Sequence, residues 1–230
     1  MSDTENFKRP VVILAPHAGG DSIAYAWLLK RLKADGEAYF FEIAGHGRRL
    51  EEAYPKSYEE IVMDFVDFIR KKTEGDKNYI IAGDSMGAYL CDSAYGKIKA
   101  MGGKLPVHVI YGAVDPKLQI NELSIKNIEK HNSNMDLLDR DNSYFRYLKD
   151  ILEKDAELLR KSETWLSSIL ECKMSFFMGK NDSLLGDVRY DWSGLAPKGY
   201  REYLFDGEHL FMTSNKNVAE TIIRIRSRYE

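Results

Sequence analysis

An α/β fold, with a mostly parallel central sheet flanked by helices, is the fold class that this sequence predicts. Short apolar runs alternate along the chain with stretches of helical periodicity, as in successive β-α-β units. One apolar run, at residues 79–82, leads through a glycine-bordered turn straight into a helical stretch. A chain of 230 residues is long enough for one such domain, and no repeat, low-complexity tract or linker divides it. We therefore expect a single domain over residues 1–230.

Two strand–helix units precede that turn. The apolar run at residues 11–15 is the first predicted strand, and it ends at Pro16. Asp21 or Ser22 is expected to cap the helix that follows. The apolar face of this helix repeats at positions i, i+3, i+4 and i+7, with the side chains of Tyr25, Leu28, Leu29 and Leu32.

The second unit begins with a strand predicted over residues 38–43. Ser57 and Glu60 have the spacing of a capping box, in which the two side chains satisfy N–H groups at the start of a helix. The helix is expected to bury a stripe formed by Ile61, Phe65, Phe68 and Ile69.

The same alternation resumes after the turn, with a helix from Ala88 onward. Further strands are predicted at residues 107–111, 174–177 and 203–205. Asn215 is expected to cap a closing helix. The inward side chains of that helix are predicted to be Val218, Ile222 and Ile225.

Residues 116–170 interrupt the alternation, because helical periodicity continues there without a strand signal. The apolar positions are Phe145, Leu148, Ile151, Leu152, Leu158 and Leu159. An insertion that follows the carboxyl end of a strand lies over the place where α/β sheets bind ligands. We interpret the segment as a helical lid, and the alternative is a set of extra helices packed on one face of the sheet.

Composition excludes several classes of function. The net charge is −3 and charged residues make up 30% of the chain, so it lacks the basic field that nucleic acid binding requires. Two cysteines, Cys91 and Cys172, are too few for a metal framework or a disulfide scaffold, and we expect reduced thiols in the core. The polar, acidic first residues are unlike a secretory signal, and no apolar run reaches the length of a membrane span. We expect a cytoplasmic monomer without a bound metal and without nucleic acid or membrane partners.

Gly83-Asp84-Ser85-Met86-Gly87 has the G-x-S-x-G pattern of a nucleophile elbow. In this strand-to-helix turn the serine adopts strained backbone angles, and glycine on both sides avoids collision with the neighbouring strand and helix. The first N–H groups of the following helix point to where negative charge develops on an attacked carbonyl. Ser85 is therefore the candidate nucleophile.

A serine hydroxyl needs a base to remove its proton and a carboxylate to orient that base. Of the five histidines, only His209 follows both the serine and the candidate acids and comes just after a predicted strand, whereas His108 reads as a core residue. Asp182 and Asp115 each end a predicted strand, where such carboxylates belong. We favour Asp182, because its strand directly precedes that of His209, and keep Asp115 as the alternative. Serine, acid, histidine is the order of the α/β-hydrolase fold.

Two backbone N–H donors are needed to stabilise the tetrahedral intermediate of acyl transfer. One is expected from Met86, directly after the nucleophile. The other is expected from the turn after the first strand, residues 16–20, at Ala18. The glycine pair in this turn, upstream of the elbow and before a helix, favours that assignment.

These segments resemble the type II, or external, thioesterases of nonribosomal peptide and polyketide synthesis. The similar segments occur in that family's order at residues 14–20, 45–49, 83–88, 179–182 and 207–211, which covers nearly the whole chain. The resemblance implies Ser85, Asp182 and His209 as the catalytic triad, with Met86 and Ala18 as oxyanion donors. It also implies a helical lid, no cofactor, and an acyl thioester substrate on the phosphopantetheine arm of an acyl or peptidyl carrier protein.

Asp84 departs from that family's pattern, which has histidine before the nucleophile. A carboxylate facing the developing oxyanion would oppose catalysis, so we expect the Asp84 side chain to point away and accept hydrogen bonds. The function implied is hydrolysis of carrier-bound acyl thioesters, for editing or product release. The same triad would also serve a small-molecule carboxylesterase or an acyltransferase, and a non-catalytic receptor on the same fold is a further alternative.

Overall fold

The structure is a computed structural model that describes residues 9–115, 143–162, 166–185 and 190–229. Its described strands form one six-stranded sheet in the order β2-β1-β3-β4-β5-β6, and every neighbouring pair is parallel. The strands are β1 (Val11–Ala15), β2 (Ala38–Phe40), β3 (Tyr79–Asp84), β4 (His108–Gly112), β5 (Lys173–Gly179) and β6 (Tyr200–Phe205). The predicted α/β class with a parallel sheet is confirmed.

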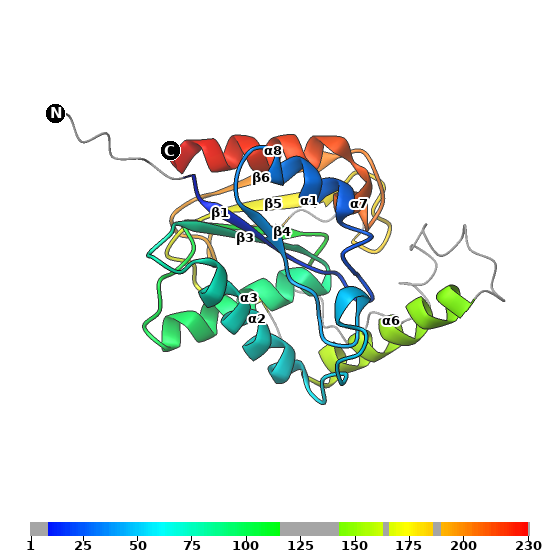
Figure 1. Cartoon of the computed structure of the whole chain (residues 1–230). Coiled ribbons are helices and arrows are strands. Elements are labelled where there is room, and N and C mark those ends of the chain that lie inside the picture. Colours follow the sequence, from blue (N-terminus) through cyan, green and yellow to red (C-terminus); the bar gives the residue numbers. More distant parts are fainter. Residues whose placement is uncertain (1–8, 116–142, 163–165, 186–189, 230) are drawn as a thin grey trace.

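Helices cover both faces of this sheet (Figure 1). The described helices are α1 (Ala26–Lys33), α2 (Tyr58–Lys72), α3 (Met86–Ala100), α6 (Ser143–Lys161), α7 (Phe211–Ser214) and α8 (Lys216–Arg226), with short 3-10 turns at Gly47–Arg49 and Ser227–Tyr229. Helices α1 and α8 lie on one face and α2 and α3 on the other, while α6 lies at the end where the strands finish (Figure 1). Among the described helices, none has both the length and the apolar character needed to cross a membrane.

Burial on both faces explains why the strands read as continuous apolar runs. In β1, Val11, Ile13 and Ala15 belong to the core beneath α2 and α3, whereas Val12 and Leu14 belong to the core beneath α1 and α8. Side chains alternate between the two faces of a strand, so a sheet with helices on both sides needs apolar residues at every position.

The strand order places a ligand site beside β1. Strand β2 lies on one side of β1, whereas β3 and β4 lie on the other side. The direction in which successive strands are added to the sheet therefore reverses next to β1. In open α/β sheets, ligands bind outside the carboxyl ends of the strands at such a reversal. Ala15, the last residue of β1, lies in register with Gly83 near the end of β3, so the segments that leave these two strands start side by side.

Several element boundaries differ from the sequence prediction, and the last strand, expected at residues 203–205, already begins at Tyr200. The strand expected at residues 38–43 ends at Phe40, although Phe41 N–H still donates to the Leu14 carbonyl at 2.9 Å. The first helix begins at Ala26, because Asp21 Oδ1 accepts the N–H groups of Ile23 and Ala24 in a separate turn ahead of it. Aspartate side chains favour such local turns over continued helix.

Other sequence predictions agree with the structure. Ser57 Oγ accepts the Glu60 N–H at 3.2 Å, and the Glu60 side chain reaches back to the Lys56 N–H at 2.8 Å, one residue before the position expected in a capping box. Asn215 caps α8 by accepting the Asn217 N–H. The inward residues of α8 are buried as predicted: Val218, Ile222 and Ile225. Both cysteines are buried free thiols.

The predicted insertion at residues 116–170 is described only in part. Residues 116–142 and 163–165 lie outside the described residues, and α6 accounts for most of the rest. Helix α6 contacts α2, and its Leu152 packs against Gly19 in the segment after β1. Its buried face includes Ile151 and Leu159.

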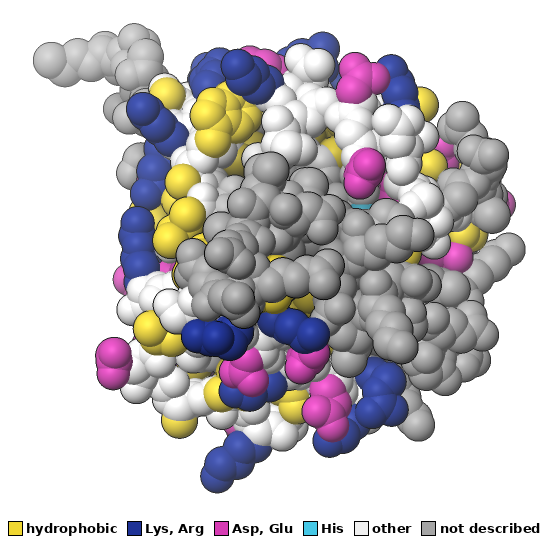
Figure 2. Space-filling view, turned by 90° about the vertical axis from the view of Figure 1, so that its right-hand side faces the viewer, with side chains coloured by type: hydrophobic (Ala, Val, Ile, Leu, Met, Phe, Trp, Pro, Cys, Tyr) yellow, Lys and Arg dark blue, Asp and Glu magenta, His cyan; other side chains and the backbone are white. Residues whose placement is uncertain are grey.

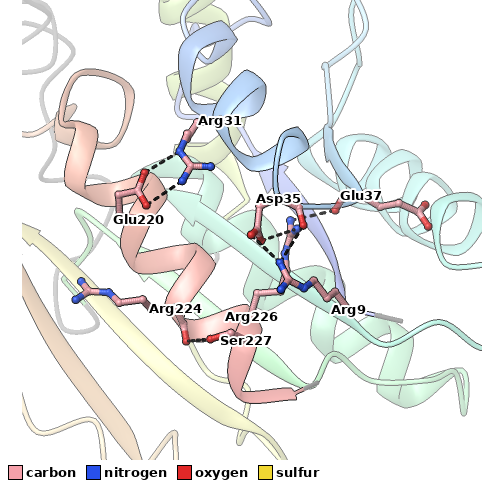
Figure 3. A network of polar contacts seen from close by, with 8 residues as sticks. All are labelled: Arg9, Arg31, Asp35, Glu37, Glu220, Arg224, Arg226 and Ser227. Atoms are coloured by element: carbon pink, nitrogen blue, oxygen red, sulfur yellow. Dashed lines mark hydrogen bonds and ion pairs between the residues drawn. The ribbon is translucent and has the colours of Figure 1, made fainter. Parts of the chain in front are cut away.

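A polar network joins α1 to α8 on the face opposite α2 and α3 (Figure 3). Arg226 is fully buried, and its guanidinium binds the Asp35 carboxylate at 3.2 Å and the Glu37 carbonyl at 3.2 Å. On the outside of the same interface, Arg31 and Glu220 form a two-bonded ion pair that is far more exposed. The last helix is thus fixed to the first by one buried and one exposed charged contact.

Candidate active site

Ser85 occupies a strained turn between β3 and α3. Its backbone angles are φ 52° and ψ −121°, a left-handed conformation that non-glycine residues seldom adopt. The Ser85 N–H donates to the Gly112 carbonyl at 2.8 Å, which fixes the turn against β4. The side chain of Ser85 remains partly exposed although the residues around it are buried.

The glycines on either side of Ser85 are required by close backbone contacts. A Cβ atom on Gly83 would collide with the carbonyl of Gly87. A Cβ atom on Gly87 would lie 2.6 Å from the Ala15 carbonyl oxygen, closer than real Cβ atoms come. The end of β1 therefore lies directly against the first turn of α3, as the elbow pattern predicted.

His209 and Asp182 form a buried pair. His209 Nδ1 lies 3.0 Å from Asp182 Oδ2, and the two residues are only 4% and 6% exposed. Asp182 Oδ1 accepts the N–H groups of Leu184 at 3.1 Å and Leu185 at 3.3 Å. With Asp182 accepting from Nδ1–H, the Nε2 atom of His209 is the ring position able to accept a proton.

The loops that carry this pair are tied to each other by their backbones. Lys180 N–H donates to the Phe205 carbonyl at 2.8 Å, and Asn181 N–H donates to the Gly207 carbonyl at 3.0 Å. Gly179 approaches so closely that its Cβ atom would lie 2.5 Å from the Glu208 carbonyl oxygen. The turn after β5 and the turn after β6 thus form one unit.

The alternative acid, Asp115, is engaged elsewhere. Asp115 Oδ2 accepts a hydrogen bond from the Tyr190 hydroxyl at 2.5 Å, and its carbonyl lies 3.4 Å from the Tyr89 hydroxyl. Of the two candidates, Asp182 is the one that the structure brings to His209. His108 is a core residue, as expected: its ring nitrogens lie 2.7 Å from the Tyr229 hydroxyl and 2.8 Å from Ser175 Oγ.

The two residues predicted to bind the oxyanion lie in neighbouring segments. Met86 is the first residue of α3, and Ala18 lies in the turn after β1, buried to 6% exposure. Gly87, next to Met86, packs against the carbonyls of Ala15 and Pro16. The N–H of Gly19, the residue after Ala18, is already bound to the Asp155 carboxylate on α6 at 2.7 Å.

Asp84 is fully buried and accepts a 2.5 Å hydrogen bond from the Tyr25 hydroxyl, in line with the expectation for this side chain. The Tyr25 oxygen accepts in turn from the His17 backbone N–H at 3.0 Å and lies 2.7 Å from His17 Nδ1, which assigns the proton of that ring to Nδ1. Burial lowers the pKa of His17, against the opposing charge of Asp84, so the ring is neutral near pH 7. Burial and Asp84 raise the pKa of Tyr25 well above its usual value.

Sequence reasoning missed Tyr25 as a polar partner and Asp155, His46 and Tyr54 as a second cluster near the site. Tyr25 fitted an apolar helix face, so its hydroxyl gave no separate signal. Asp155 did give a signal in the sequence, because it is the acidic residue on the buried stripe of α6.

The face at the carboxyl ends of the strands carries both signs of charge. In Figure 2 basic and acidic side chains both lie along the margins of this face, and only a small area of histidine surface is visible. That agrees with the low exposure of the described histidines: His17, His46, His108 and His209. The described residues contain no group of three or more histidine, cysteine, aspartate or glutamate side chains that could hold a metal ion.

Comparison with known families gives one full-length match. The model of the thioesterase domain family matches residues 10–228. This chain belongs to the thioesterase domain family. Its sheet with flanking helices is the α/β-hydrolase type that the sequence predicted, and the predicted resemblance to thioesterases is confirmed.

Solved structures with the same fold come from biosynthetic pathways. RedJ, a thioesterase of prodiginine biosynthesis in Streptomyces coelicolor, has a TM-score of 0.77 and 18% identity, covering 96% of this chain and 85% of RedJ. ClbQ, from the colibactin pathway, has a TM-score of 0.74 and 17% identity, covering 96% of both chains. BorB, a type II thioesterase from the borrelidin cluster, has a TM-score of 0.73 and 17% identity, covering 96% of this chain and 92% of BorB. Comparison with curated protein sequences gave no significant match.

Proposed function

We propose that this thioesterase hydrolyses acyl thioesters carried on the phosphopantetheine arms of acyl or peptidyl carrier proteins, through a covalent intermediate on Ser85. The observation that carries the proposal is the backbone of Ser85, which is held in a left-handed turn between two glycines in a chain of the thioesterase family. Such a turn keeps a hydroxyl clear of the backbone at the carboxyl edge of the sheet. The His209–Asp182 pair supports it as the base and its orienting acid.

The proposed chemistry has two steps. His209 Nε2 takes the proton of Ser85 Oγ as that oxygen attacks the thioester carbonyl, and the N–H groups of Met86 and Ala18 bind the resulting oxyanion. The C–S bond then breaks, and the pantetheine sulfur leaves with the proton that His209 held. In the second step water attacks the acyl-enzyme and gives a proton to His209. His209 passes that proton to Ser85 Oγ as the acyl–oxygen bond breaks, which releases the acid and the free serine.

No cofactor takes part in this scheme, because the chain supplies the nucleophile, base and acid and the substrate brings its own pantetheine arm. BorB, which shares the fold, is a type II thioesterase from a biosynthetic cluster, and this supports a carrier protein as partner. We propose further that the segment over residues 116–170, of which the structure describes α6, acts as a lid over the acyl chain. A cytoplasmic, monomeric enzyme with neither nucleic acid nor membrane as a partner would fit the role.

The test compares two substrates with the same acyl group, one as a thioester on a carrier protein and one as a p-nitrophenyl ester. We expect kcat/KM to favour the carrier-bound thioester. Ser85→Ala should lower kcat by about 10⁵–10⁶, as expected when a serine nucleophile is lost. Ser193→Ala, on an exposed serine, is the matched control and should leave the rate unchanged.

Two outcomes would contradict the proposal. A strong preference for the oxygen ester would identify a small-molecule carboxylesterase. Failure of a fluorophosphonate probe to label Ser85 in the folded protein would identify a receptor without catalysis. Running the carrier-bound reaction with added alcohols or amines separates hydrolysis from acyl transfer, because an acyltransferase would form the new ester or amide in place of the acid.

A further inference from the structure

A fully buried carboxylate on α6 ties this helix to the segments that follow β1 and β2. Asp155 Oδ2 accepts hydrogen bonds from the Gly19 N–H at 2.7 Å and from His46 Nε2 at 3.0 Å. Its other oxygen accepts one from the Tyr54 hydroxyl at 2.6 Å. A buried carboxylate is costly unless it is paired and hydrogen-bonded, so these three donors are what make an aspartate tolerable here.

Asp155 stands where the helix pattern calls for an apolar side chain. Leu152, three residues earlier, and Leu159, four residues later, are both buried on the same face. Two turns before Asp155 on this face, the Tyr147 hydroxyl accepts the Gly47 N–H at 3.1 Å. A residue that breaks the local pattern of its element marks a place where function has overridden packing. Helix α6 thus binds backbone N–H groups in two loops beside the site.

The backbone that Asp155 binds is a type II β-turn over residues 17–20. The Gly20 N–H donates to the His17 carbonyl at 2.9 Å and closes the turn. Gly19 has φ +72°, which a type II turn requires at its third position.

The carboxylate favours this turn type over its alternative. Conversion of a type II turn to type I rotates the central peptide, which here joins Ala18 to Gly19. That rotation would withdraw the Gly19 N–H from Asp155 and swing the Ala18 carbonyl oxygen toward the negative charge. The close packing of Gly19 on α6, where a Cβ atom would lie 3.1 Å from Leu152 Cβ, leaves little room for other movements.

We propose that Asp155 is a positioning residue for oxyanion stabilisation: by accepting the Gly19 N–H, it anchors the 17–20 turn against α6 and so fixes the place of the neighbouring Ala18 N–H, which donates to the substrate carbonyl oxygen. The inference rests on the proposed function, in which Ala18 supplies one of the two donors. Because the Gly19 N–H is already bound to Asp155, it does not compete for this role.

His46 and Tyr54 keep the carboxylate in place. Burial acts to lower the pKa of His46, but the hydrogen bond and charge of Asp155 outweigh it, and the pKa of His46 is raised. Burial and the charge of Asp155 raise the pKa of Tyr54, so its hydroxyl stays protonated and remains a donor. His46 and Tyr54 thus hold the Asp155 carboxylate in place while it accepts the Gly19 N–H.

The test uses two substitutions of Asp155 and reads the oxyanion site directly. Asp155→Asn replaces a charged acceptor by a weaker neutral one, and kcat should fall about tenfold. Asp155→Ala should lower kcat by about 10²–10³, the usual loss when an oxyanion donor is removed. KM should change by less than about threefold, since only transition-state binding is lost. The Ki of an acyl trifluoromethyl ketone, whose adduct with Ser85 carries the oxyanion, should rise by the same factor as kcat falls.

Two controls separate positioning from stability. Rates are expressed per active site titrated with a fluorophosphonate, so that a smaller folded fraction does not count as slower chemistry. Asp150→Asn is the matched variant, because Asp150 lies on the exposed side of the same helix in an ion pair with Lys154 at 2.6 Å, and it should leave kcat, KM and Ki unchanged. Tyr54→Phe removes one donor to Asp155 without touching Gly19, and a smaller fall in kcat is expected.

Some results would overturn the inference. Unchanged kcat per titrated site in Asp155→Asn and Tyr54→Phe would do so, even if Asp155→Ala fails to fold. A rise in KM with constant Ki would show that Asp155 only shapes the acyl pocket. These outcomes differ from failure of the proposed function, in which the wild-type enzyme itself would not hydrolyse the carrier-bound thioester or label at Ser85.

Discussion

Asp84 places a buried carboxylate directly before the candidate nucleophile. The family that the sequence resembles has histidine at this position. The Tyr25 hydroxyl takes up one of its oxygens, and among the described residues the other, Oδ2, has no hydrogen-bond partner. The Nδ1 atom of His17 lies 3.8 Å from Oδ2. Since His17 is neutral near pH 7, the Tyr25 hydrogen bond is the main contact that holds Asp84.

Asp84→Asn is therefore expected to leave the site largely intact, because the asparagine oxygen still accepts from Tyr25. We predict kcat/KM within about tenfold of wild type, the cost of weakening one hydrogen bond. Asp84→Ala should instead lower the free energy of unfolding by about 1–3 kcal/mol, since it leaves the buried Tyr25 hydroxyl without an acceptor. Steady-state kinetics on the carrier-bound thioester and urea unfolding measure the two effects. If Asp84→Asn loses as much activity as Ser85→Ala, the carboxylate takes part in the chemistry.

At the scale of elements, the polar contacts of α8 and those of α6 have different roles. Helix α8 is fixed to the turn after α1 by charged contacts around Arg226, on the face opposite α2 and α3 (Figure 3). Helix α6 is fixed by polar groups to loops beside Ser85. The first set of contacts should determine stability, whereas the second should determine rate.

Asp35→Asn tests the first half of that distinction. Arg226 is fully buried, and weakening its carboxylate partner should lower the free energy of unfolding by about 3 kcal/mol. Glu220→Gln, at the exposed Arg31 pair of the same interface, should cost less than about 1 kcal/mol. Both variants should keep wild-type kcat per titrated site. Equal losses of stability from the two changes would mean that burial of Arg226 adds nothing to the contact with Asp35.

At the scale of the whole molecule, most of the architecture could be predicted, because burial on both faces of the sheet requires continuous apolar runs in the sequence. Apolar runs gave the strands, and the glycines around Ser85 gave the elbow, since each rule depends only on neighbouring residues. The end of the second strand was misplaced because the apolar side chains of Phe41 and Ile43 stay buried after the ladder ends. The start of the first helix was misplaced because Asp21 satisfies the preceding turn instead.

The site was harder to predict, because its geometry comes from contacts between distant segments. The elbow, His209 and the preference for Asp182 follow from local patterns and strand order. The partners of Asp155 lie more than a hundred residues away from it in Gly19, His46 and Tyr54, and no local rule joins them. Only the position of an aspartate on a buried stripe gave a hint.

Buried histidines predict how the stability of the whole molecule depends on pH. Burial, with added repulsion from Arg228 and Lys173, lowers the pKa of His108 to about 3. In the unfolded chain the same group titrates near pH 6.5. Between these values the unfolded state binds more protons, so the contribution of His108 is complete above pH 6.5 and is lost as the pH falls. The slope from this one group is up to about 1.4 kcal/mol per pH unit.

Replacing His108 should therefore flatten the acid side of the stability curve. The asparagine in His108→Asn keeps a donor and an acceptor for Tyr229 and Ser175 but cannot titrate. We therefore expect a lower free energy of unfolding at pH 7.5. We also expect that the slope of this free energy against pH, between pH 4.5 and 6, falls by the equivalent of up to about one bound proton. Urea unfolding at a series of pH values measures both. The other titratable groups, His17 and His46 included, are present in both proteins and cancel in the difference. The pKa of His46 is raised, so its own contribution to stability is lost as the pH rises. Parallel curves of unfolding free energy against pH for the two proteins would contradict this prediction. They would mean that His108 takes up a proton as readily in the folded state as in the unfolded one, and that its contacts with Tyr229 and Ser175 adapt to the charge.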